Sequence, residues 1–278
     1  YNPLFEHENC GAGFICSLEG KKTNDIISKA LNILTCLEHR GAVSSDGRTG
    51  DGAGILIEIP DIFFKKECKF NLPEFKEYAV GMVFLPPKKN QLNYCVDIFE
   101  EEIKRQGLNI LGWRDVPVNS KVVGAIASQS QPNIKQVFVG KNVPNQTEKD
   151  FLLRLYISRK ISENRIYQSK LSQRSFFYFS SLHNKTIIYK GLLIPEDIER
   201  FYIDLKNPML VTRLALVHQR FSTNTFPTWD LAQPFRYMCH NGEINTLKGN
   251  INRMVSRQEL MDSELIDKKD LEKVFPII

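Results

Sequence analysis

Glu8-Asn9-Cys10-Gly11-Ala12-Gly13-Phe14-Ile15-Cys16 joins a short polar leader to an apolar run, with a thiol at the junction and two glycines soon after it. The apolar run predicts a strand. Thiolate chemistry needs an accessible sulfur and close approach of a substrate to the backbone, so Cys10 is a candidate nucleophile. Free cysteines are also common as inert core residues at the start of a strand. Taken alone, this stretch leaves both interpretations open.

The composition is that of an ordinary globular protein. The chain has 278 residues, enough for one large domain or two small ones, with 42% hydrophobic and 25% charged residues. The net charge is +5, but basic and acidic residues are interspersed along the whole length. The sequence has no basic block with interleaved aromatics, no long apolar run and no signal peptide. We therefore expect neither nucleic acid nor a membrane as a partner.

The cysteines are scattered without a paired spacing. They are Cys10, Cys16, Cys36, Cys68, Cys95 and Cys239, and none of them forms a C-x-x-C motif. This spacing argues against a zinc site and against a disulfide scaffold, so we expect no metal in this chain and a reducing compartment around it.

Apolar periodicity predicts a mixture of strands and helices. Helix signals begin at Thr23, a candidate N-cap, and run to about Arg40. The remaining predicted strands are 55–59, 79–85, 108–118, 134–139 and 214–218, with a hairpin over 176–189. The remaining predicted helices are 90–106, 147–168, 195–202 and one from Thr246 onward. Because the order lacks βαβ regularity, we expect an antiparallel α+β fold.

Residues 39–54 form the most unusual local composition, with five glycines, two arginines and two aspartates in sixteen residues. Glycines permit positive φ and close approach of a ligand. A flexible linker would also be rich in glycine, but it would seldom carry paired charges and lead directly into a strand. We interpret the segment as a functional loop, and the phosphate-loop pattern is absent from it.

Two further patches carry candidate chemistry. The strand 214–218 leads into Gln219-Arg220-Phe221-Ser222-Thr223-Asn224-Thr225, where an arginine beside hydroxyls suits a carboxylate, although a structural salt bridge is equally compatible. Asn241-Gly242 is either a hairpin turn or an oxyanion hole, in which the amide of Asn241 and the N–H of Gly242 point at one carbonyl oxygen.

Taken in order, five segments resemble the class II glutamine amidotransferases. They are Cys10-Gly11-Ala12-Gly13-Phe14-Ile15, Glu38-His39-Arg40-Gly41-Ala42, Gly50-Asp51-Gly52-Ala53-Gly54-Ile55, His218-Gln219-Arg220-Phe221-Ser222-Thr223-Asn224-Thr225 and His240-Asn241-Gly242-Glu243-Ile244-Asn245. The last two segments are most similar to the amino-terminal domains of glutamate synthases of the large-subunit type.

The resemblance implies an N-terminal nucleophile hydrolase fold, a four-layer αββα sandwich of two antiparallel sheets. It places the nucleophile on Cys10, the cysteine-proximal arginine on Arg40 and the oxyanion pair on Asn241 and Gly242. It also places the substrate-binding residues on Arg220 and Thr223.

In the family the base is the α-amino group of the cysteine itself. Nine residues precede Cys10 here, so we expect residues 1–9 to be a leader removed by cleavage between Asn9 and Cys10. Residues 10–278 would then be the amidotransferase domain. The apolar end of the chain suggests an excerpt from a longer protein. The family's Gly-Ser-Asp-Ser stretch, whose aspartate holds the substrate ammonium, is absent from the chain and is expected beyond Ile278.

The implied reaction is hydrolysis of L-glutamine to glutamate and ammonia through a thioester on Cys10. In a full-length glutamate synthase the ammonia would reach synthase domains of the same chain and aminate 2-oxoglutarate. FMN and an iron–sulfur cluster of the 3Fe-4S type would serve there, with ferredoxin or a reductase subunit as electron donor, but no cofactor is expected in this segment. The compartment would be the bacterial cytoplasm or the plastid stroma.

Two alternatives remain open on the residues alone. One is a different class II amidotransferase that delivers ammonia to a phosphoribosyl or sugar acceptor. The other is a catalytically silent scaffold domain, against which the joint presence of Cys10, Arg220, Asn241 and Gly242 argues. A papain-like hydrolase lacks support, because its Cys-Gly-Ser-Cys-Trp context does not occur.

Overall fold

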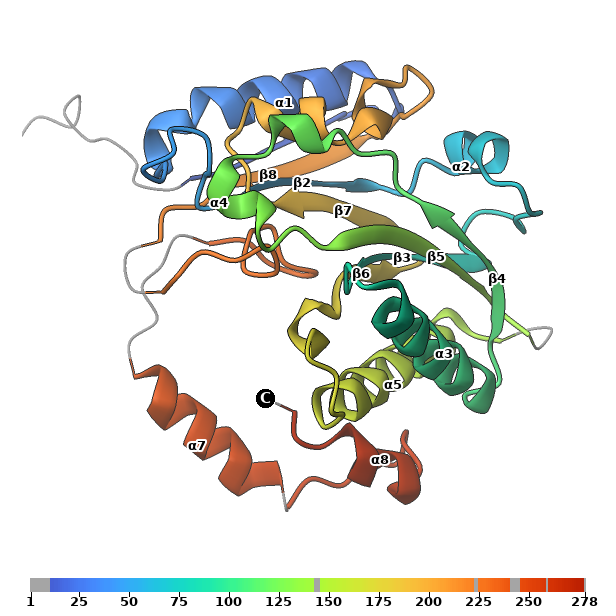
Figure 1. The fold of residues 1–278 in the computed structure, drawn as a ribbon. Coiled ribbons are helices and arrows are strands. Elements are labelled where there is room, and N and C mark those ends of the chain that lie inside the picture. The colour runs from blue at the N-terminus through green and yellow to red at the C-terminus, as the bar shows by residue number, and fades with distance from the viewer. Residues whose placement is uncertain (1–10, 143–145, 223–224, 241–245, 259, 278) are drawn as a thin grey trace, which may run out of the picture.

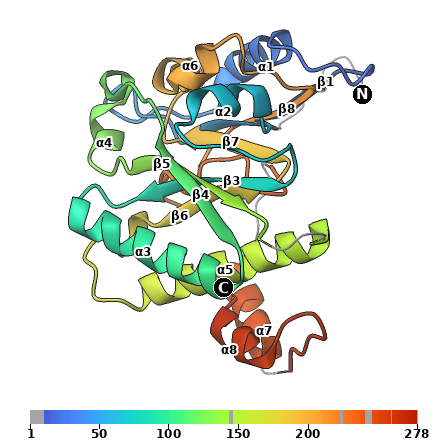
Figure 2. The ribbon, with the colours of Figure 1, turned by 90° about the vertical axis from the view of Figure 1, so that its right-hand side faces the viewer.

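A computed structural model describes the chain except for residues 1–10, 143–145, 223–224, 241–245, 259 and 278. Two four-stranded antiparallel sheets lie face to face between layers of helices (Figures 1 and 2). This arrangement confirms the predicted α+β sandwich of two antiparallel sheets.

The first sheet has the strand order β1-β8-β2-β7. Its strands are β1 (Ala12–Cys16), β2 (Ala53–Glu58), β7 (Thr186–Gly191) and β8 (Leu214–Gln219). His218 of β8 pairs with Ala12 of β1 on one side and with Gly54 of β2 on the other, so β8 lies between β1 and β2. Helix α1 (Asp25–Cys36) covers the outer face of this sheet (Figure 1).

The second sheet has the order β4-β5-β3-β6. Its strands are β3 (Tyr78–Leu85), β4 (Asn109–Asp115), β5 (Asn133–Gly140) and β6 (Tyr178–His183), and helices α3 (Lys89–Arg105) and α5 (Glu148–Tyr167) cover its outer face (Figure 2). Every residue of β3 is buried, because both faces of this strand are covered. Its alternate side chains divide between two cores, as the two-residue period of a strand requires.

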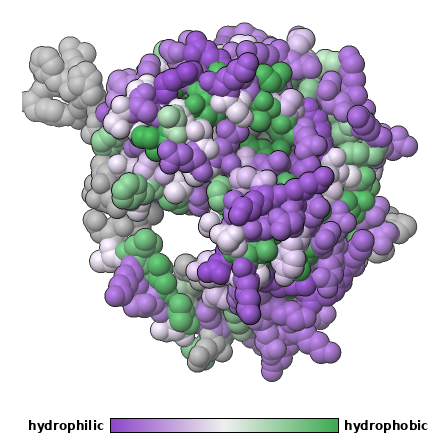
Figure 3. All heavy atoms as spheres, in the orientation of Figure 1, coloured by the Kyte–Doolittle hydropathy of each residue, from purple (hydrophilic) through white to green (hydrophobic). Residues whose placement is uncertain are grey.

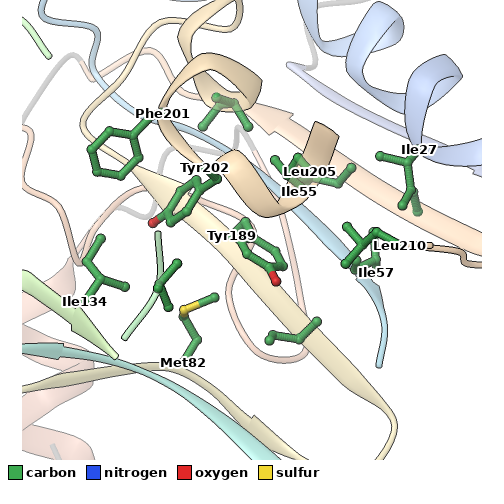
Figure 4. Packing of buried hydrophobic residues seen from close by; sticks show 14 of the residues in the cluster. Ile27, Ile55, Ile57, Met82, Ile134, Tyr189, Phe201, Tyr202, Leu205 and Leu210 are labelled. Atoms are coloured by element: carbon green, nitrogen blue, oxygen red, sulfur yellow. The ribbon is translucent and has the colours of Figure 1, made fainter. Parts of the chain in front are cut away.

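The first core lies between the sheets and extends beneath α1. Met82 of β3 faces Tyr189 of β7 across this core (Figure 4). A hydrogen bond of 3.2 Å from the side chain of Gln136, on β5, to the Tyr189 hydroxyl joins the two sheets. The second core lies between the second sheet and α3 and α5, and it contains the alternate β3 residues Val83 and Leu85.

The short helices are α2 (Asp61–Glu67), α4 (Ala125–Ser128), α6 (Asp197–Phe201), α7 (Leu247–Gln258) and α8 (Lys268–Val274). Helix α7 has no buried residue, and its apolar residues Leu247 and Val255 are exposed. Hydrophobic residues gather on the surface at the lower left of Figure 3, where Figure 1 places this helix. No helix among the described residues is long and apolar enough to cross a lipid bilayer.

Most predicted elements are confirmed within a few residues, but three expectations need correction. The predicted hairpin over 176–189 is wrong, because β6 and β7 belong to different sheets and the turn between them passes from one layer to the other. The N-cap position of α1 is Asn24 rather than Thr23, whose backbone instead pairs with Thr212. The apolar closing segment 274–278, whose composition suits a strand, forms none among its described residues: Val274 ends helix α8, and residues 275–277 have no regular secondary structure.

Candidate active site at the end of strand β8

The carboxyl end of β8 lies beside the start of β1. Gln219 donates its backbone N–H to the carbonyl of Gly11 at 2.7 Å, one residue beyond the last ladder pair between these strands. Gly11 is the residue that follows Cys10, and Cys10 itself lies outside the described residues. The end of β8 therefore holds the backbone next to the predicted nucleophile.

The side chain of Gln219 reaches a second predicted site segment. It packs against Gly41 so closely that a Cβ atom at position 41 would clash with its carboxamide. Gly41 follows Arg40, the last residue of a 3₁₀ turn over Glu38–Arg40, and Arg40 is half-buried. A glycine is required here by space, and the close approach ties the segment of Arg40 to β8.

The glycine-rich segment holds the chain that follows β8. Arg220 donates its backbone N–H to the carbonyl of Gly52 at 2.8 Å. Two residues on, the N–H of Ser222 donates to the carboxylate of Asp51 at 2.6 Å, and Asp51 is only 7% exposed. The segment is therefore packed against the site rather than being a flexible linker, as expected for a functional loop.

The Arg220 guanidinium is oriented by its own neighbours. Its Nη2 donates to the hydroxyls of Ser222 at 3.2 Å and Thr225 at 2.8 Å. These hydroxyls accept from the arginine and thereby orient its guanidinium. Nη1 is buried and has no hydrogen-bond partner among the described residues.

The charge of Arg220 is only partly balanced. Burial lowers the pKa of this guanidinium, and the carboxylates of Asp51 and Asp230 oppose the shift. A buried donor without an acceptor costs about 1–3 kcal/mol, and an anionic ligand that accepts from it recovers this cost. The arrangement is chemically suited to bind a carboxylate at Nη1.

His240, the residue before Asn241, is held by side chains on both its backbone groups. Gln233 donates its Nε2–H to the His240 carbonyl at 2.8 Å and accepts the His240 N–H on Oε1 at 2.9 Å. The imidazole of His218, on β8, lies with Nε2 at 3.1 Å from the same carbonyl. Because a carbonyl oxygen only accepts, His218 carries a proton on Nε2.

Lys190 of β7 supports the segment that carries Gln233. Its ammonium, although fully buried, donates to the carbonyls of Asp230 at 2.8 Å and Ala232 at 2.6 Å, and to the hydroxyl of Tyr178 at 3.3 Å. It also lies 4.8 Å from the ring centroids of Tyr178 and Phe235. Burial lowers the pKa of Lys190 well below its ordinary value.

Of the predicted site residues, the structure describes Arg40 and Arg220. Cys10, Thr223, Asn241 and Gly242 lie outside the described residues. The sequence reasoning missed the residues that hold this region together, which are Asp51, Gln219, Gln233 and Lys190. The one usable sequence signal was Lys190, a lysine at the end of the apolar strand Ile187-Ile188-Tyr189.

A metal centre does not fit the described residues. Among them, no three histidine, cysteine, aspartate or glutamate side chains lie close enough together to hold an ion. The described cysteines are dispersed: Cys95 is buried in the second core, whereas Cys16 and Cys36 are exposed. A cysteine-ligated cluster would need several of these thiols in one place.

Comparison with known proteins adds two findings. The sequence profile of the family described as "Glutamine amidotransferases class-II" matches residues 10–278. The "Glutamate synthase [NADPH] large chain" of Bacillus subtilis is 48% identical over 279 residues, which cover 100% of this chain and 18% of that protein.

Two further relatives come from eukaryotes. The "Glutamate synthase [NADH]" of Saccharomyces cerevisiae is 44% identical over 100% of this chain and 13% of its own length. The "Ferredoxin-dependent glutamate synthase 2, chloroplastic" of Arabidopsis thaliana is 44% identical over 94% of this chain and 16% of its own. The chain thus spans less than a fifth of each of these three relatives.

Proposed function

This chain belongs to the class II glutamine amidotransferases, and we propose that it hydrolyses L-glutamine with Cys10 as the nucleophile. The observation that carries the proposal is the convergence at the end of β8. Residues adjacent to Cys10, Arg40 and Asn241 all contact Gln219 or His218, and Arg220 follows directly in the chain. Four predicted site segments, far apart in sequence, thereby meet at one place.

In the proposed reaction the Cys10 thiolate adds to the side-chain amide carbon of glutamine. The new carbon–sulfur bond sends the carbonyl electron pair onto oxygen, where the Asn241 amide and the Gly242 N–H stabilise the charge. Collapse of this intermediate re-forms the carbonyl and breaks the carbon–nitrogen bond, and the nitrogen takes the proton that the thiol gave to the base and leaves as ammonia. Water then cleaves the thioester and releases glutamate and the thiol.

Arg220 would hold the substrate during these steps. Its buried Nη1 is available to a carboxylate, and Ser222 and Thr225 fix the plane of the guanidinium. Thr223 would support the same carboxylate, and Arg40 would lie near the cysteine. The tie between Gln219 and Gly41 supports this placement of Arg40.

The base would be the α-amino group of Cys10. Its ordinary pKa of about 7.7–8 lies close to working pH, so it can accept and return the proton. Residues 1–9 would therefore be a leader whose removal exposes this amine, leaving 10–278 as the amidotransferase domain. The family match, which begins at residue 10, supports this boundary.

The setting we propose is a glutamate synthase, in which ammonia passes to synthase domains of the same chain and aminates 2-oxoglutarate. The relatives' names support this setting, since they include an NADPH form and a ferredoxin-dependent, chloroplastic form. The electron donor would be ferredoxin or a reductase subunit, and the compartment a bacterial cytoplasm or a plastid. FMN and a 3Fe-4S cluster would lie in those other domains, as the resemblance to glutamate synthases implies. The aspartate that binds the substrate ammonium would also come from beyond Ile278.

The test is the amino terminus and the thiol of the intact protein. We expect mass analysis of the active enzyme to find Cys10 as the first residue. We expect Cys10→Ala to lose glutamine hydrolysis, whereas the exposed Cys16→Ala keeps it. Full hydrolysis by Cys10→Ala, or by protein that still carries residues 1–9, would refute the mechanism.

Glutamine binding by these 278 residues can be tested separately. If the ammonium site is completed by residues beyond Ile278, the 278-residue chain alone should bind glutamine weakly. Titration calorimetry that compares it with a longer chain tests this expectation, and equal affinity of the two chains would contradict it.

A further inference from the structure

The segment from Gln233 to His240 forms a closed loop. The backbone N–H of Phe235 donates to the carbonyl of Met238 at 2.8 Å, which turns the chain back on itself. The Gln233 carboxamide then closes the loop through its two hydrogen bonds with His240. The carboxamide satisfies both backbone groups of one residue, as a neighbouring strand would.

Two donors converge on the His240 carbonyl, Nε2 of Gln233 and Nε2 of His218. This carbonyl belongs to the planar peptide unit that also carries the N–H of Asn241. Fixing the carbonyl direction with two donors therefore fixes the plane in which the chain continues toward Asn241. A single donor would constrain the orientation of this peptide less than the two donors do.

Gln233 is itself held by rigid elements. Gln233 is only 6% exposed. Its backbone carbonyl lies against Gly54 of β2, so closely that a Cβ atom added at Gly54 would come within 2.5 Å of the carbonyl oxygen. The neighbouring carbonyl of Ala232 accepts from Lys190 of β7 at 2.6 Å. The backbone that carries the Gln233 carboxamide is therefore packed against two strands of the first sheet.

We propose that Gln233 is a positioning residue of the amidotransferase reaction, which holds His240 so that Asn241 and Gly242 present the oxyanion donors. This assignment rests on the proposed function. Gln233 does not touch glutamine in this account and acts through the His240 backbone. Its contribution is to place a donor at the oxygen on which charge develops, so it should affect turnover more than substrate binding.

The decisive variant is Gln233→Glu in the intact protein. It keeps the size of the side chain and an oxygen that accepts from the His240 N–H, but it loses the donor to the His240 carbonyl. We expect kcat for glutamine hydrolysis to fall about 10- to 100-fold, less than loss of a whole oxyanion donor because His218 still donates. KM should change by less than about threefold, since the Arg220 segment is untouched.

Thiol alkylation separates positioning from general disruption. Iodoacetamide reacts with a thiolate without needing an oxyanion hole, so Cys10 should be alkylated at the wild-type rate in Gln233→Glu. A merely structural effect would change the alkylation rate, the KM and the kcat together. Gln233→Leu, which removes both hydrogen bonds, should lower kcat at least as far, and a melting curve identifies a variant that fails to fold.

A matched control is Gln136→Leu. Gln136 is also a fully buried glutamine with side-chain hydrogen bonds, to Tyr189 and Arg114, but it lies on β5 in the second sheet. Gln136→Leu should lower the free energy of unfolding while leaving kcat for glutamine hydrolysis close to that of the wild type.

The outcomes distinguish this assignment from the proposed function. If Cys10→Ala is inactive and Gln233→Glu keeps the wild-type kcat, the positioning role is wrong and the proposed function stands. If KM rises as steeply as kcat falls, or Gln136→Leu loses the same turnover, Gln233 is structural only. If Cys10→Ala stays active, both assignments fail.

Discussion

Replacing the buried Lys190 with methionine tests how the segment beneath the site is held. Lys190→Met keeps the aliphatic stem and removes the amine that donates to the carbonyls of Asp230 and Ala232. Each buried carbonyl left without its donor costs about 1–3 kcal/mol. Relief of the buried amine's desolvation offsets part of this cost, so we expect a net loss of about 2–4 kcal/mol in the free energy of unfolding near pH 10.

The size of this loss depends on pH. Folding lowers the pKa of Lys190, so between that lowered value and the ordinary 10.5 the unfolded chain binds more protons than the folded chain. The contribution of Lys190 to stability therefore rises with pH across this window, by at most about 1.36 kcal/mol per pH unit. Lys190→Met lacks the contribution, so its deficit relative to the wild type should grow as the pH rises.

The assay is urea unfolding at several pH values from about 8 to about 10. Fluorescence of Trp229, which is 4% exposed and packs against Phe201, reports on this region. Lys149→Met on the exposed face of α5 is the control for loss of a lysine, and it should stay within about 0.5 kcal/mol of the wild type. A deficit of Lys190→Met that stays constant or shrinks with rising pH would refute the reasoning.

Three further substitutions test other contacts. Arg114→Met leaves the buried carboxylate of Asp204 without its bidentate partner at 2.7 and 2.8 Å, and should lower the free energy of unfolding by about 3–5 kcal/mol; a loss below about 1 kcal/mol would contradict this. Asp51→Ala removes the acceptor of the Ser222 N–H and should raise KM for glutamine about tenfold, with a smaller change in kcat. An unchanged KM would contradict this role of Asp51. Gly54→Ala places a Cβ 2.5 Å from a backbone carbonyl and should lower stability by about 1–3 kcal/mol in the same urea assay, and a stability equal to the wild type would show that the backbone yields there.

Much of the fold follows from local pattern. The continuous apolar run of β3 identifies a strand that is buried on both faces. The apolar residues of α1 and α3 recur at the 3.6-residue period of a helix with one buried face. The hairpin prediction was wrong because the sequence of a turn between two apolar strands is the same whether the strands pair with each other or join different sheets. Both β6 and β7 are almost wholly buried, so no polar face marks which sheet each strand joins.

The site was predictable only where its residues carry their own chemistry. A guanidinium such as that of Arg220 indicates an anion in any fold. Gln233 carries no such signal, since its role comes from a backbone carbonyl that folding brings to it. Lys190 stands out as a lysine at the end of an apolar strand, but its partners do not. They are carbonyls about 40 residues further along the chain, and a contact over that separation leaves no local pattern.

The place of β1 in its sheet has a consequence for how the enzyme is made. β1 is an edge strand whose only neighbour in the strand order is β8, about 200 residues further along the chain. At ribosomal rates of about 5–20 residues per second, β8 is synthesised roughly 10–40 s after β1. Until then the start of the chain has no sheet to join, so under the proposed mechanism the reactive amine cannot be set in place on a half-made protein. The strand order thus delays formation of the proposed active site until nearly all strands of the sandwich have been synthesised.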